Sequence, residues 1–372
     1  MEPLPRGADP TSIRRWNEVA VVRALYAGGP QRIRALRDTT GITPGPLGQV
    51  LRSLEQKHWV ESARAEITGP GRPAQIFRLV PPRGWLIGVD VTPTVLRAVR
   101  IDATGSVHAR AEQENIADVE PEVSFAALVN LMDRVLPGDD YSSIWAAMIA
   151  IDAEFDDDAM VLDSAALPRL VGTRAGDRMN ARIPVPLDAT GRMPAMLTAE
   201  MFEGAAIDMS NFMEINMGER IEAGVVVDGR PIGGSHQVAG LFPQVTTSRV
   251  AAVTDAARNG DEAARRTICE DVSRYVDSIA MAIALADPRA LILSGPLATV
   301  PDLVLPYLRD ELGRRLRSVP EVRVTGLDDY GVATGAARCA LEWVLSVLLG
   351  ADTGAMDLTR STFLARIREI GI

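Results

Sequence analysis

The sequence predicts an α/β protein with a small, mainly helical N-terminal domain and a larger body. Three helical patterns near the N-terminus are separated by glycine-containing breaks, and an order of strands, helix and strand occurs twice in the body. The charge divides at the same place. Residues 1–83 hold 13 Arg and Lys against 7 Asp and Glu, or +6, which leaves −16 for the remainder of a chain of net charge −10. A length of 372 residues also exceeds one average domain.

The N-terminal domain opens with two helical segments of regular apolar spacing. The first covers residues 11–27 and stops at Gly28-Gly29-Pro30, and the second covers residues 31–39. A turn at Gly41 then leads to Thr43 and a third helix, because threonine suits an N-cap and the proline after it suits the first helical position. Two helices, a tight glycine turn and a third helix together predict a helix-turn-helix.

The third predicted helix has an apolar and a polar face. The apolar face carries Leu47, Val50, Leu51 and Leu54. Gln49, Arg52 and Ser53 lie on the other face, and Thr43 can cap the helix. If this helix enters the major groove of DNA, Gln49 and Arg52 are the best candidates for base contacts. Three positions near its start offer no base-reading side chain, namely Gly45, Pro46 and Gly48. We therefore expect sequence specificity to be modest or carried elsewhere.

A short hairpin follows the third helix. Residues 59–60 and 75–79 alternate like two strands around the loop 68–73, which predicts a wing with Arg72 at its tip. Such a wing lies against the DNA backbone or minor groove, whereas in a plain three-helix domain Arg72 would be a solvated loop residue. A basic N-terminal domain can meet phosphates while the acidic body does not. We therefore expect Thr43, Gln49, Arg52 and Arg72 to contact double-stranded DNA.

The body contains two related halves. Meandering strands between residues 84 and 109, a helix over 121–135 and a buried strand over 144–151 form the first half. The second half has strands at 212–217 and 223–227, helices at 249–259 and 262–286, a strand at 290–293, a helix at 301–316 and a strand at 321–324. A last long helix covers 331–349, and a short terminal helix follows residue 357. Duplicated α/β halves commonly bind a ligand between them.

Several short segments resemble the ROK family, which comprises repressors and sugar kinases. Asn17 in the first helix and Gly71-Arg72-Pro73 in the wing are typical of its regulators. The segments of the body that are similar are Gly88-Val89-Asp90, Asp228 to Gly234, Ala239-Gly240, Leu293-Ser294-Gly295 and residues 331–337. The resemblance extends from Thr11 to Leu345. It implies an N-terminal winged helix-turn-helix followed by a two-lobed actin-like or hexokinase-like (ribonuclease H-like) domain.

The resemblance also implies a domain division and a function. Residues 1–82 would form the winged helix-turn-helix, 83–187 together with 331–372 the first lobe, and 188–330 the second lobe. The implied protein is a DNA-binding transcriptional regulator, more a repressor than an activator, that forms a homodimer or homotetramer. Its partner would be an inverted-repeat operator.

The kinase chemistry of the family has no evident counterpart. The resemblance places the carboxylate base of the kinases eight residues before a helix glutamate, and counting back from Glu200 gives Arg192. An arginine stays protonated and cannot act as a base. Pro93 removes a backbone donor from the first phosphate turn, and the segment Gly218 to Glu222 brings carboxylates to the second. We expect no catalytic residue and no cofactor; the alternative is an ATP-dependent sugar kinase in which Asp188 replaces the base.

The sugar and zinc contacts of the family are altered as well. Leu241 to Gln244 replaces the glutamate and histidine that follow Ala-Gly in many relatives, and no cysteine cluster follows, so we expect no metal site. Five residues remain candidates for an effector site: Arg192, Glu219, Arg220, His236 and Gln244. Arginine there could bind an acidic or phosphorylated small molecule, not necessarily a sugar, or these charges could pair with one another.

Composition excludes other classes of protein. Hydrophobic residues make up 47% of the chain, without a continuous apolar run long enough for a membrane helix, and residues 1–10 lack the apolar stretch of a signal peptide. We expect a cytoplasmic protein without a membrane partner, whose Cys269 and Cys339 are reduced core residues. A third hypothesis is a non-enzymatic interaction protein that has lost both DNA binding and the ligand site.

Overall fold

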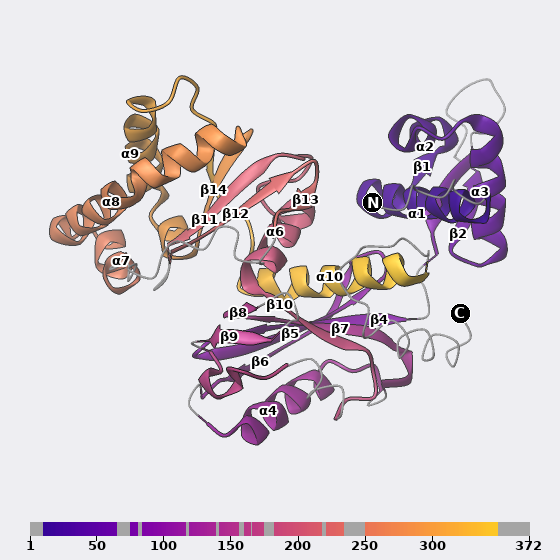
Figure 1. The fold of residues 1–372 in the computed structure, drawn as a ribbon, viewed down its shortest axis with the longest axis horizontal. Coiled ribbons are helices and arrows are strands. Elements are labelled where there is room, and N and C mark those ends of the chain that lie inside the picture. The colour runs from indigo at the N-terminus through magenta and orange to yellow at the C-terminus, as the bar shows by residue number, and fades with distance from the viewer. Residues whose placement is uncertain are drawn as a thin grey trace, which may run out of the picture.

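The computed structural model confirms an α/β chain in which a helical N-terminal unit lies beside a two-lobed body (Figure 1). It describes residues 10–64, 75–80, 84–116, 119–138, 141–155, 160–164, 166–174, 182–217, 221–233 and 250–348. Each lobe of the body is built on one five-stranded sheet. Among the described helices, none is long and apolar enough to cross a membrane.

The N-terminal unit contains the predicted helices and hairpin. Its helices are α1 (Pro10–Gly28), α2 (Ile33–Thr40) and α3 (Pro44–Gln56). Its strands are β1 (Gln31–Arg32), β2 (Val60–Arg64) and β3 (Gln75–Leu79), in the order β1-β3-β2. Strand β1 had been expected to be the start of the second helix, but its two residues pair with β3 and close the small sheet beside the helices.

The first lobe is built on a sheet of order β10-β7-β4-β5-β6. Its strands are β4 (Trp85–Val91), β5 (Val95–Asp102), β6 (Val107–Glu114), β7 (Ile144–Ile151) and β10 (Leu187–Gly191). Strands β4, β5 and β6 form the predicted antiparallel meander, and β7 and β10 are parallel to β4. Along the chain, β7 and β10 are separated by a small hairpin of β8 (Ala153–Phe155) and β9 (Val161–Ser164) and by the turn η2 (Pro168–Leu170).

The second lobe repeats this connectivity, as the duplicated pattern predicts. Its strands are β11 (Phe212–Met217), β12 (Ile221–Val227), β13 (Arg230–Pro231), β14 (Ala290–Ser294) and β15 (Glu321–Val324). Strands β11, β12 and β13 are antiparallel neighbours, and β14 and β15 are parallel to β11. The hairpin between β12 and β13 turns at Asp228 and Gly229, whose φ angles of 49° and 73° explain a glycine there. The order β13-β12-β11-β14-β15 is therefore that of the first sheet.

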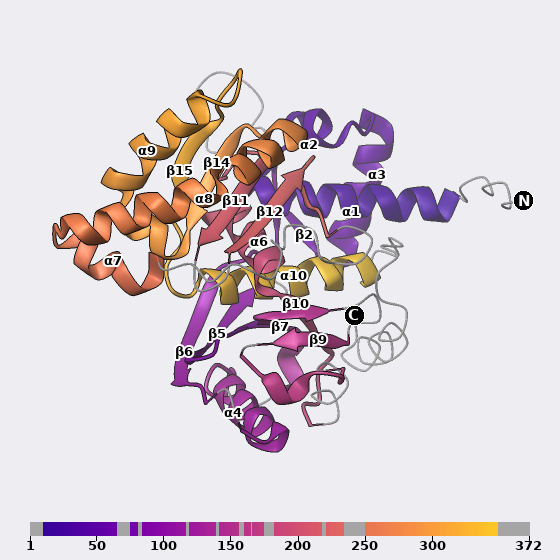
Figure 2. The same ribbon diagram turned by 60° about the vertical axis from the view of Figure 1, so that its left-hand side comes forward.

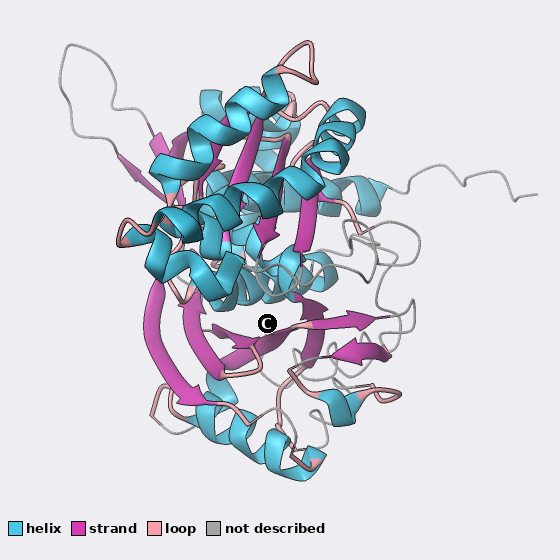
Figure 3. Cartoon of the chain, turned by 90° about the vertical axis from the view of Figure 1, so that its left-hand side faces the viewer, coloured by secondary structure: helices cyan, strands magenta, loops and turns pink. Residues whose placement is uncertain are grey.

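Helices cover both faces of each sheet (Figures 2 and 3). The outer faces pack against α4 (Pro121–Asp133) in the first lobe and against α7 (Val250–Arg258), α8 (Glu262–Ala286) and α9 (Pro301–Gly313) in the second. Helix α8 begins where predicted because the Asp261 carboxylate accepts hydrogen bonds from two backbone N–H groups of its first turn. Between the lobes lie α6 (Arg192–Glu203) and α10 (Gly331–Leu348), and short turns η1 (Tyr141–Ser143) and η3 (Gly295–Thr299) flank β7 and β14.

Residues 152–203 contain several elements that the sequence patterns did not predict. Strand β10 pairs with β7 over all five of its residues and therefore belongs to the first sheet. The boundary expected between residues 187 and 188 falls inside this strand. Helix α6 follows directly, with Gly191 at its N-cap and Pro194 in its first turn. Proline is tolerated there because the first N–H groups of a helix have no intrahelical partner.

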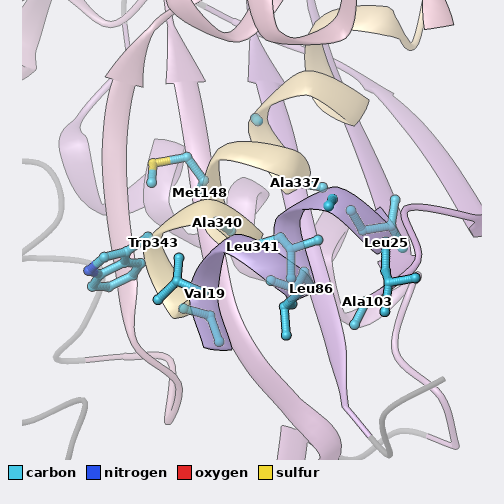
Figure 4. Packing of buried hydrophobic residues seen from close by; sticks show 14 of the residues in the cluster. Val19, Leu25, Leu86, Ala103, Met148, Ala337, Ala340, Leu341 and Trp343 are labelled. Atoms are coloured by element: carbon cyan, nitrogen blue, oxygen red, sulfur yellow. The ribbon is translucent and has the colours of Figure 1, made fainter. Parts of the chain in front are cut away.

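The N-terminal unit is packed against the first lobe and α10. Val19 and Leu25 of α1 share one buried cluster with Leu86 of β4 and Leu341 of α10 (Figure 4). The guanidinium group of Arg23 lies 2.9 Å from the Glu342 carboxylate, and the rings of Trp59 and Trp145 are 5.7 Å apart. Helix α10 therefore joins the N-terminal unit to the body through apolar contact and an ion pair, and the packing of Trp59 on Trp145 adds a contact with β7.

Candidate functional site

Helix α3 presents its polar face to solvent in the N-terminal unit. Leu47, Val50, Leu51 and Leu54 are buried, whereas Gln49 and Arg52 are exposed, as predicted. Ser53 was predicted on the exposed face, but it is buried and donates a hydrogen bond of 2.6 Å to Glu18 of α1. Glu18 is only 2% exposed and also accepts from the Lys57 ammonium group at 2.7 Å. This buried carboxylate needs donors, which explains why Ser53 turns inward.

The start of α3 has the predicted backbone geometry with a different cap. Thr43 occupies the N-cap in an extended conformation, and its carbonyl oxygen accepts from Leu47 N–H at 3.0 Å. Its hydroxyl makes no capping hydrogen bond, so the predicted side-chain cap is wrong. The turn before it depends on Gly41, whose φ of 68° favours glycine and whose N–H donates to the Arg37 carbonyl. Thr43 is therefore exposed beside α3 with its hydroxyl available to another partner.

Arg52 is the cation that α3 offers to solvent. Among the described residues it has no ion pair or hydrogen bond. A Cβ atom on Gly48 would lie 3.7 Å from its guanidinium, so the side chain runs back along the helix past Gly48, while Gly45 has open space around it. Because Gly45 and Gly48 carry no side chains, nothing projects beyond the backbone at these two positions in the N-terminal half of the helix. Arg72 and the loop that carries it lie outside the described residues.

The body brings a second group of charges together at one edge of its first sheet. Strands β4, β7 and β10 are parallel, so their carboxyl ends meet, and these ends carry Asp90, Asp152 and Arg192. This edge is where ligands commonly bind in open α/β sheets. Arg192 Nε lies 2.7 Å from Asp90 Oδ1, and its Nη2 donates to Oδ2 at 3.2 Å. The Asp90 side chain is only 2% exposed, so a buried carboxylate is paired by a two-pronged guanidinium group.

Arg192 remains charged in this site. Burial alone would lower the pKa of its guanidinium group, but the carboxylates of Asp90, Glu222 and Asp152 outweigh burial and raise it. Three carboxylates thus act on one cation. Of the two alternatives raised by the sequence, an acid-binding arginine or an internal ion pair, the geometry favours the ion pair, although the partner is Asp90 from 102 residues earlier in the chain.

The other predicted ligand residues are only partly placed. Glu219, Arg220, His236 and Gln244 lie outside the described residues. Asp188 lies half-buried on β10, where its Oδ1 accepts from the Ala189 N–H at 2.8 Å. Among described residues, no group of three or more His, Cys, Asp or Glu side chains could hold a metal ion.

Cys339 lies on α10 where that helix packs against α6. Burial raises the pKa of its thiol to about 11, and a hydrogen bond to Thr198 partly offsets this increase.

Sequence reasoning missed Asp152 and Glu214. Asp152 follows the buried strand β7, and the end of a predicted parallel strand was a signal that could have found it. Glu214 occupies the middle of β11, with both carboxylate oxygens buried and without a hydrogen-bonding partner among the described residues. Its position inside the apolar stretch Phe-Met-Glu-Ile was the available signal.

Comparisons with known proteins identify the fold. No family model matches the chain, and no curated protein matches it. A solved structure of a ROK family transcriptional regulator, described as a homologue of the Escherichia coli Mlc protein, is 17% identical, covers 96% of this chain and 100% of its own, and has a TM-score of 0.70. The ROK family glucokinase of Streptomyces griseus, solved with glucose and AMPPNP, is 20% identical with a TM-score of 0.60, covering 70% of this chain and 100% of its own.

A third similar structure is the ROK hexokinase of Thermus thermophilus, which is 18% identical with a TM-score of 0.59 and covers 70% of this chain and 99% of its own. The predicted fold, a winged helix-turn-helix before a two-lobed α/β body like that of ROK proteins, is confirmed. The similarity to the regulator includes nearly the whole chain, whereas the similarity to the kinases leaves nearly a third of it unmatched.

Proposed function

We propose that this protein is a DNA-binding transcriptional regulator, acting as a repressor, with a body that does not transfer phosphate. The observation that carries the proposal is the exposed polar face of α3, presented by a three-helix unit that is packed firmly on the body. A regulator of the ROK family has the same arrangement over 96% of this chain. Helices in this position of a helix-turn-helix enter the major groove.

In this proposal Gln49 and Arg52 read base edges, and Thr43 and Arg72 bind phosphates or the minor groove. Arg52 suits the role because it is exposed and has no intramolecular partner among the described residues to give up. The smooth surface of Gly45 and Gly48 allows the helix backbone to approach the DNA closely. Few side chains are left to discriminate between bases, so shape and phosphate contacts supply much of the affinity.

The body serves for assembly and for response to an effector. The position that the resemblance assigns to the kinase base holds Arg192, whose guanidinium group forms an ion pair with the Asp90 carboxylate. A guanidinium group cannot accept the proton of a sugar hydroxyl at neutral pH. A homodimer or homotetramer would present paired α3 helices to an inverted repeat, with half-site centres about 10 bp apart or a multiple of that spacing.

Sequencing of genomic DNA captured by the purified protein tests this function, with Arg52→Ala as the probe and Arg266→Ala on α8 as the matched control. We expect an inverted-repeat site whose affinity falls about tenfold or more in Arg52→Ala. Arg266 is exposed on the body, and its replacement leaves binding unchanged. Absence of enriched DNA, even at low salt, contradicts the proposal and favours an interaction protein without DNA binding.

The kinase alternative depends on Asp188, which lies on the edge strand β10, four residues before Arg192 at the start of α6. A coupled phosphate-transfer assay over hexoses and N-acetylhexosamines tests it directly. We expect no turnover above the background of the assay. Turnover that disappears in Asp188→Asn would establish an enzyme and contradict this part of the proposal.

A further inference from the structure

Glu214 is a buried carboxyl group that neither the DNA contacts nor the Asp90–Arg192 pair uses. Its side chain is fully buried, and neither carboxyl oxygen has a hydrogen-bonding partner among the described residues. It lies on the inner face of β11 with Phe212 and Asn216, while the residues between them pack outward. The Asn216 Oδ1 atom is also buried and without a partner. Two neighbouring groups on one face thus each have an acceptor oxygen that no donor meets among the described residues.

Helix α6 presses on the sheet next to this group. Glu214 pairs in register with Gly224 of β12, and a Cβ atom on Gly224 would lie 2.6 Å from Leu197 Cδ1 and 2.8 Å from Met193 Cγ of α6. The next turn of the same helix carries Glu200. The Glu214 carboxyl group therefore lies under the contact between α6 and the second sheet.

The charged groups around Glu214 are mainly of its own sign. Glu200 from α6 and Glu222 from β12 both raise the pKa of Glu214. A weak hydrogen bond from the Ser294 hydroxyl of β14 would lower it, but this hydroxyl lies 3.4 Å from the Ile215 carbonyl and is placed to donate there. The arginines of α6 and β15 have other partners. Arg192 pairs with Asp90, and Arg323 donates to the Ala205 carbonyl and to Glu321.

Glu200 differs from Glu214 because it has donors. The Ala205 N–H donates to its Oε2 at 2.5 Å, and the Thr325 hydroxyl donates to its Oε1. Burial raises the pKa of Glu200, and these two hydrogen bonds partly offset the increase. For Glu214, burial first and then the charges of Glu200 and Glu222 raise the pKa well above its usual range.

We propose that Glu214 is a proton-operated latch: its protonated carboxyl group holds α6 on the second sheet, and loss of the proton releases the helix. A proton on Glu214 turns one of its two unpartnered acceptors into a donor and removes a charge from a fully buried position. An ionised Glu214 would be uncompensated beside two further carboxylates, and the nearest way to hydrate it is to lift α6. The latch does not depend on DNA binding.

The movement of α6 on release would be transmitted to the rest of the molecule through α10, which packs against it. A Cβ atom on Gly335 of α10 would overlap the Ala195 carbonyl of α6, so the two helices are in backbone contact. The Cys339 thiol of α10 lies 3.5 Å from the Thr198 hydroxyl of α6. The accessibility of the Cys339 thiol therefore reports on this contact. Helix α10 also packs against α1 of the N-terminal unit.

The linkage has a definite sign. A carboxyl group whose folded-state pKa is raised keeps its proton in the folded protein after the unfolded chain has lost it. Its contribution to stability is fully present below the unfolded pKa of about 4.3, and it declines as pH rises towards the folded-state pKa. Replacement of Glu214 by glutamine removes this decline of stability with rising pH.

Thermal unfolding midpoints of wild type, Glu214→Gln and Glu114→Gln between about pH 5 and about pH 8 test the proton. Glu114 is exposed on β6, so its variant is a matched control for removal of one carboxylate. We expect the midpoint of wild type to fall relative to Glu214→Gln by about 2 °C per pH unit, and the control to follow wild type. A constant difference between wild type and Glu214→Gln at every pH overturns the proposal.

Alkylation of Cys339 in a Cys269→Ser background tests the release of α6. We expect the wild-type rate, divided by that of Glu214→Gln, to rise up to about tenfold per pH unit once Glu214 ionises. A ratio that stays constant with pH overturns the latch, because thiolate formation alone acts equally in both proteins. If Glu214→Gln does not fold, Glu214→Leu replaces it, and the infrared carbonyl band of a neutral carboxyl group in folded wild type must persist at neutral pH.

Discussion

Strands β4 and β11 have the same place in the topology of their two sheets, but the residues on their inner faces have different surroundings. Counting back from the hairpin that follows each strand, Asp90 of β4 corresponds to Asn216 of β11, and Gly88 corresponds to Glu214. In the first sheet the glycine lets α10 lie directly on the strand, and the charged residue is paired by Arg192. In the second sheet the carboxyl group takes the central position, and its oxygens have no hydrogen-bonding partner in the part of the chain that the structure describes.

The difference teaches how two halves of one fold divide their tasks. A buried charge is tolerated when an opposite charge and hydrogen bonds meet it, as at Asp90. A buried carboxyl group without such partners is tolerated only when it is neutral, which makes it sensitive to pH. The first sheet is therefore built as a fixed platform for α10 and the N-terminal unit, and the second contains the element that can change.

The largest expected effect comes from breaking the ion pair of the first sheet. Arg192→Met leaves Asp90 buried and without its partner, close to Glu222 and Asp152. We expect the free energy of unfolding to fall by about 4 kcal/mol, measured by chemical denaturation followed by circular dichroism. Adding Asp90→Asn to this variant removes the stranded charge and recovers at least about 1 kcal/mol. A loss that is the same with and without Asp90→Asn would show that the ion pair is not what Arg192 contributes.

Gly88→Ala gives the next largest effect. A Cβ atom at this position would overlap the Ala333 carbonyl and the Ala337 N–H of α10, and a helix backbone cannot move away without disturbing its other contacts. We expect a loss of about 3 kcal/mol in the free energy of unfolding by the same measurement. Gly45→Ala is the control, because Gly45 lies in a helix with open space around it, and alanine there stabilises by up to about 1 kcal/mol. Equal effects of the two variants would contradict close packing of α10 on β4.

Much of the fold could be predicted because its elements have strong local signals. The strand Phe212–Met217, the strand Glu321–Val324 and the helix Glu262–Ala286 match their predicted limits residue for residue. Each combines a regular apolar pattern with a clear boundary, such as the Asp261 cap. Strand β10 and helix α6 had no such signal, since a five-residue strand with Asp188 and Gly191 resembles a loop, and Pro194 resembles a helix breaker.

The candidate site was less predictable than the fold for a different reason. The exposure of Gln49 and Arg52 follows from helical periodicity, which is a local property, and it was predicted correctly. The inward turn of Ser53 and the pairing of Arg192 with Asp90 depend on residues 35 and 102 positions away. Only packing decides which distant carboxylate a polar residue meets, so such pairs cannot be derived from spacing along the chain.

The smallest effect is expected from Gly224→Ala in the second sheet. Its close neighbours are the side-chain ends of Leu197 and Met193, which can change rotamer, instead of helix backbone. We expect a loss of about 1 kcal/mol in the free energy of unfolding, well below that of Gly88→Ala. Combining Gly224→Ala with Leu197→Ala would then cost less than the sum of the two single variants, by at least about 0.5 kcal/mol in a double-mutant cycle. Strict additivity, or a loss as large as that of Gly88→Ala, would mean that α6 is as rigidly fixed to its sheet as α10 is, and a helix fixed in that way could not act as the moving part of a latch.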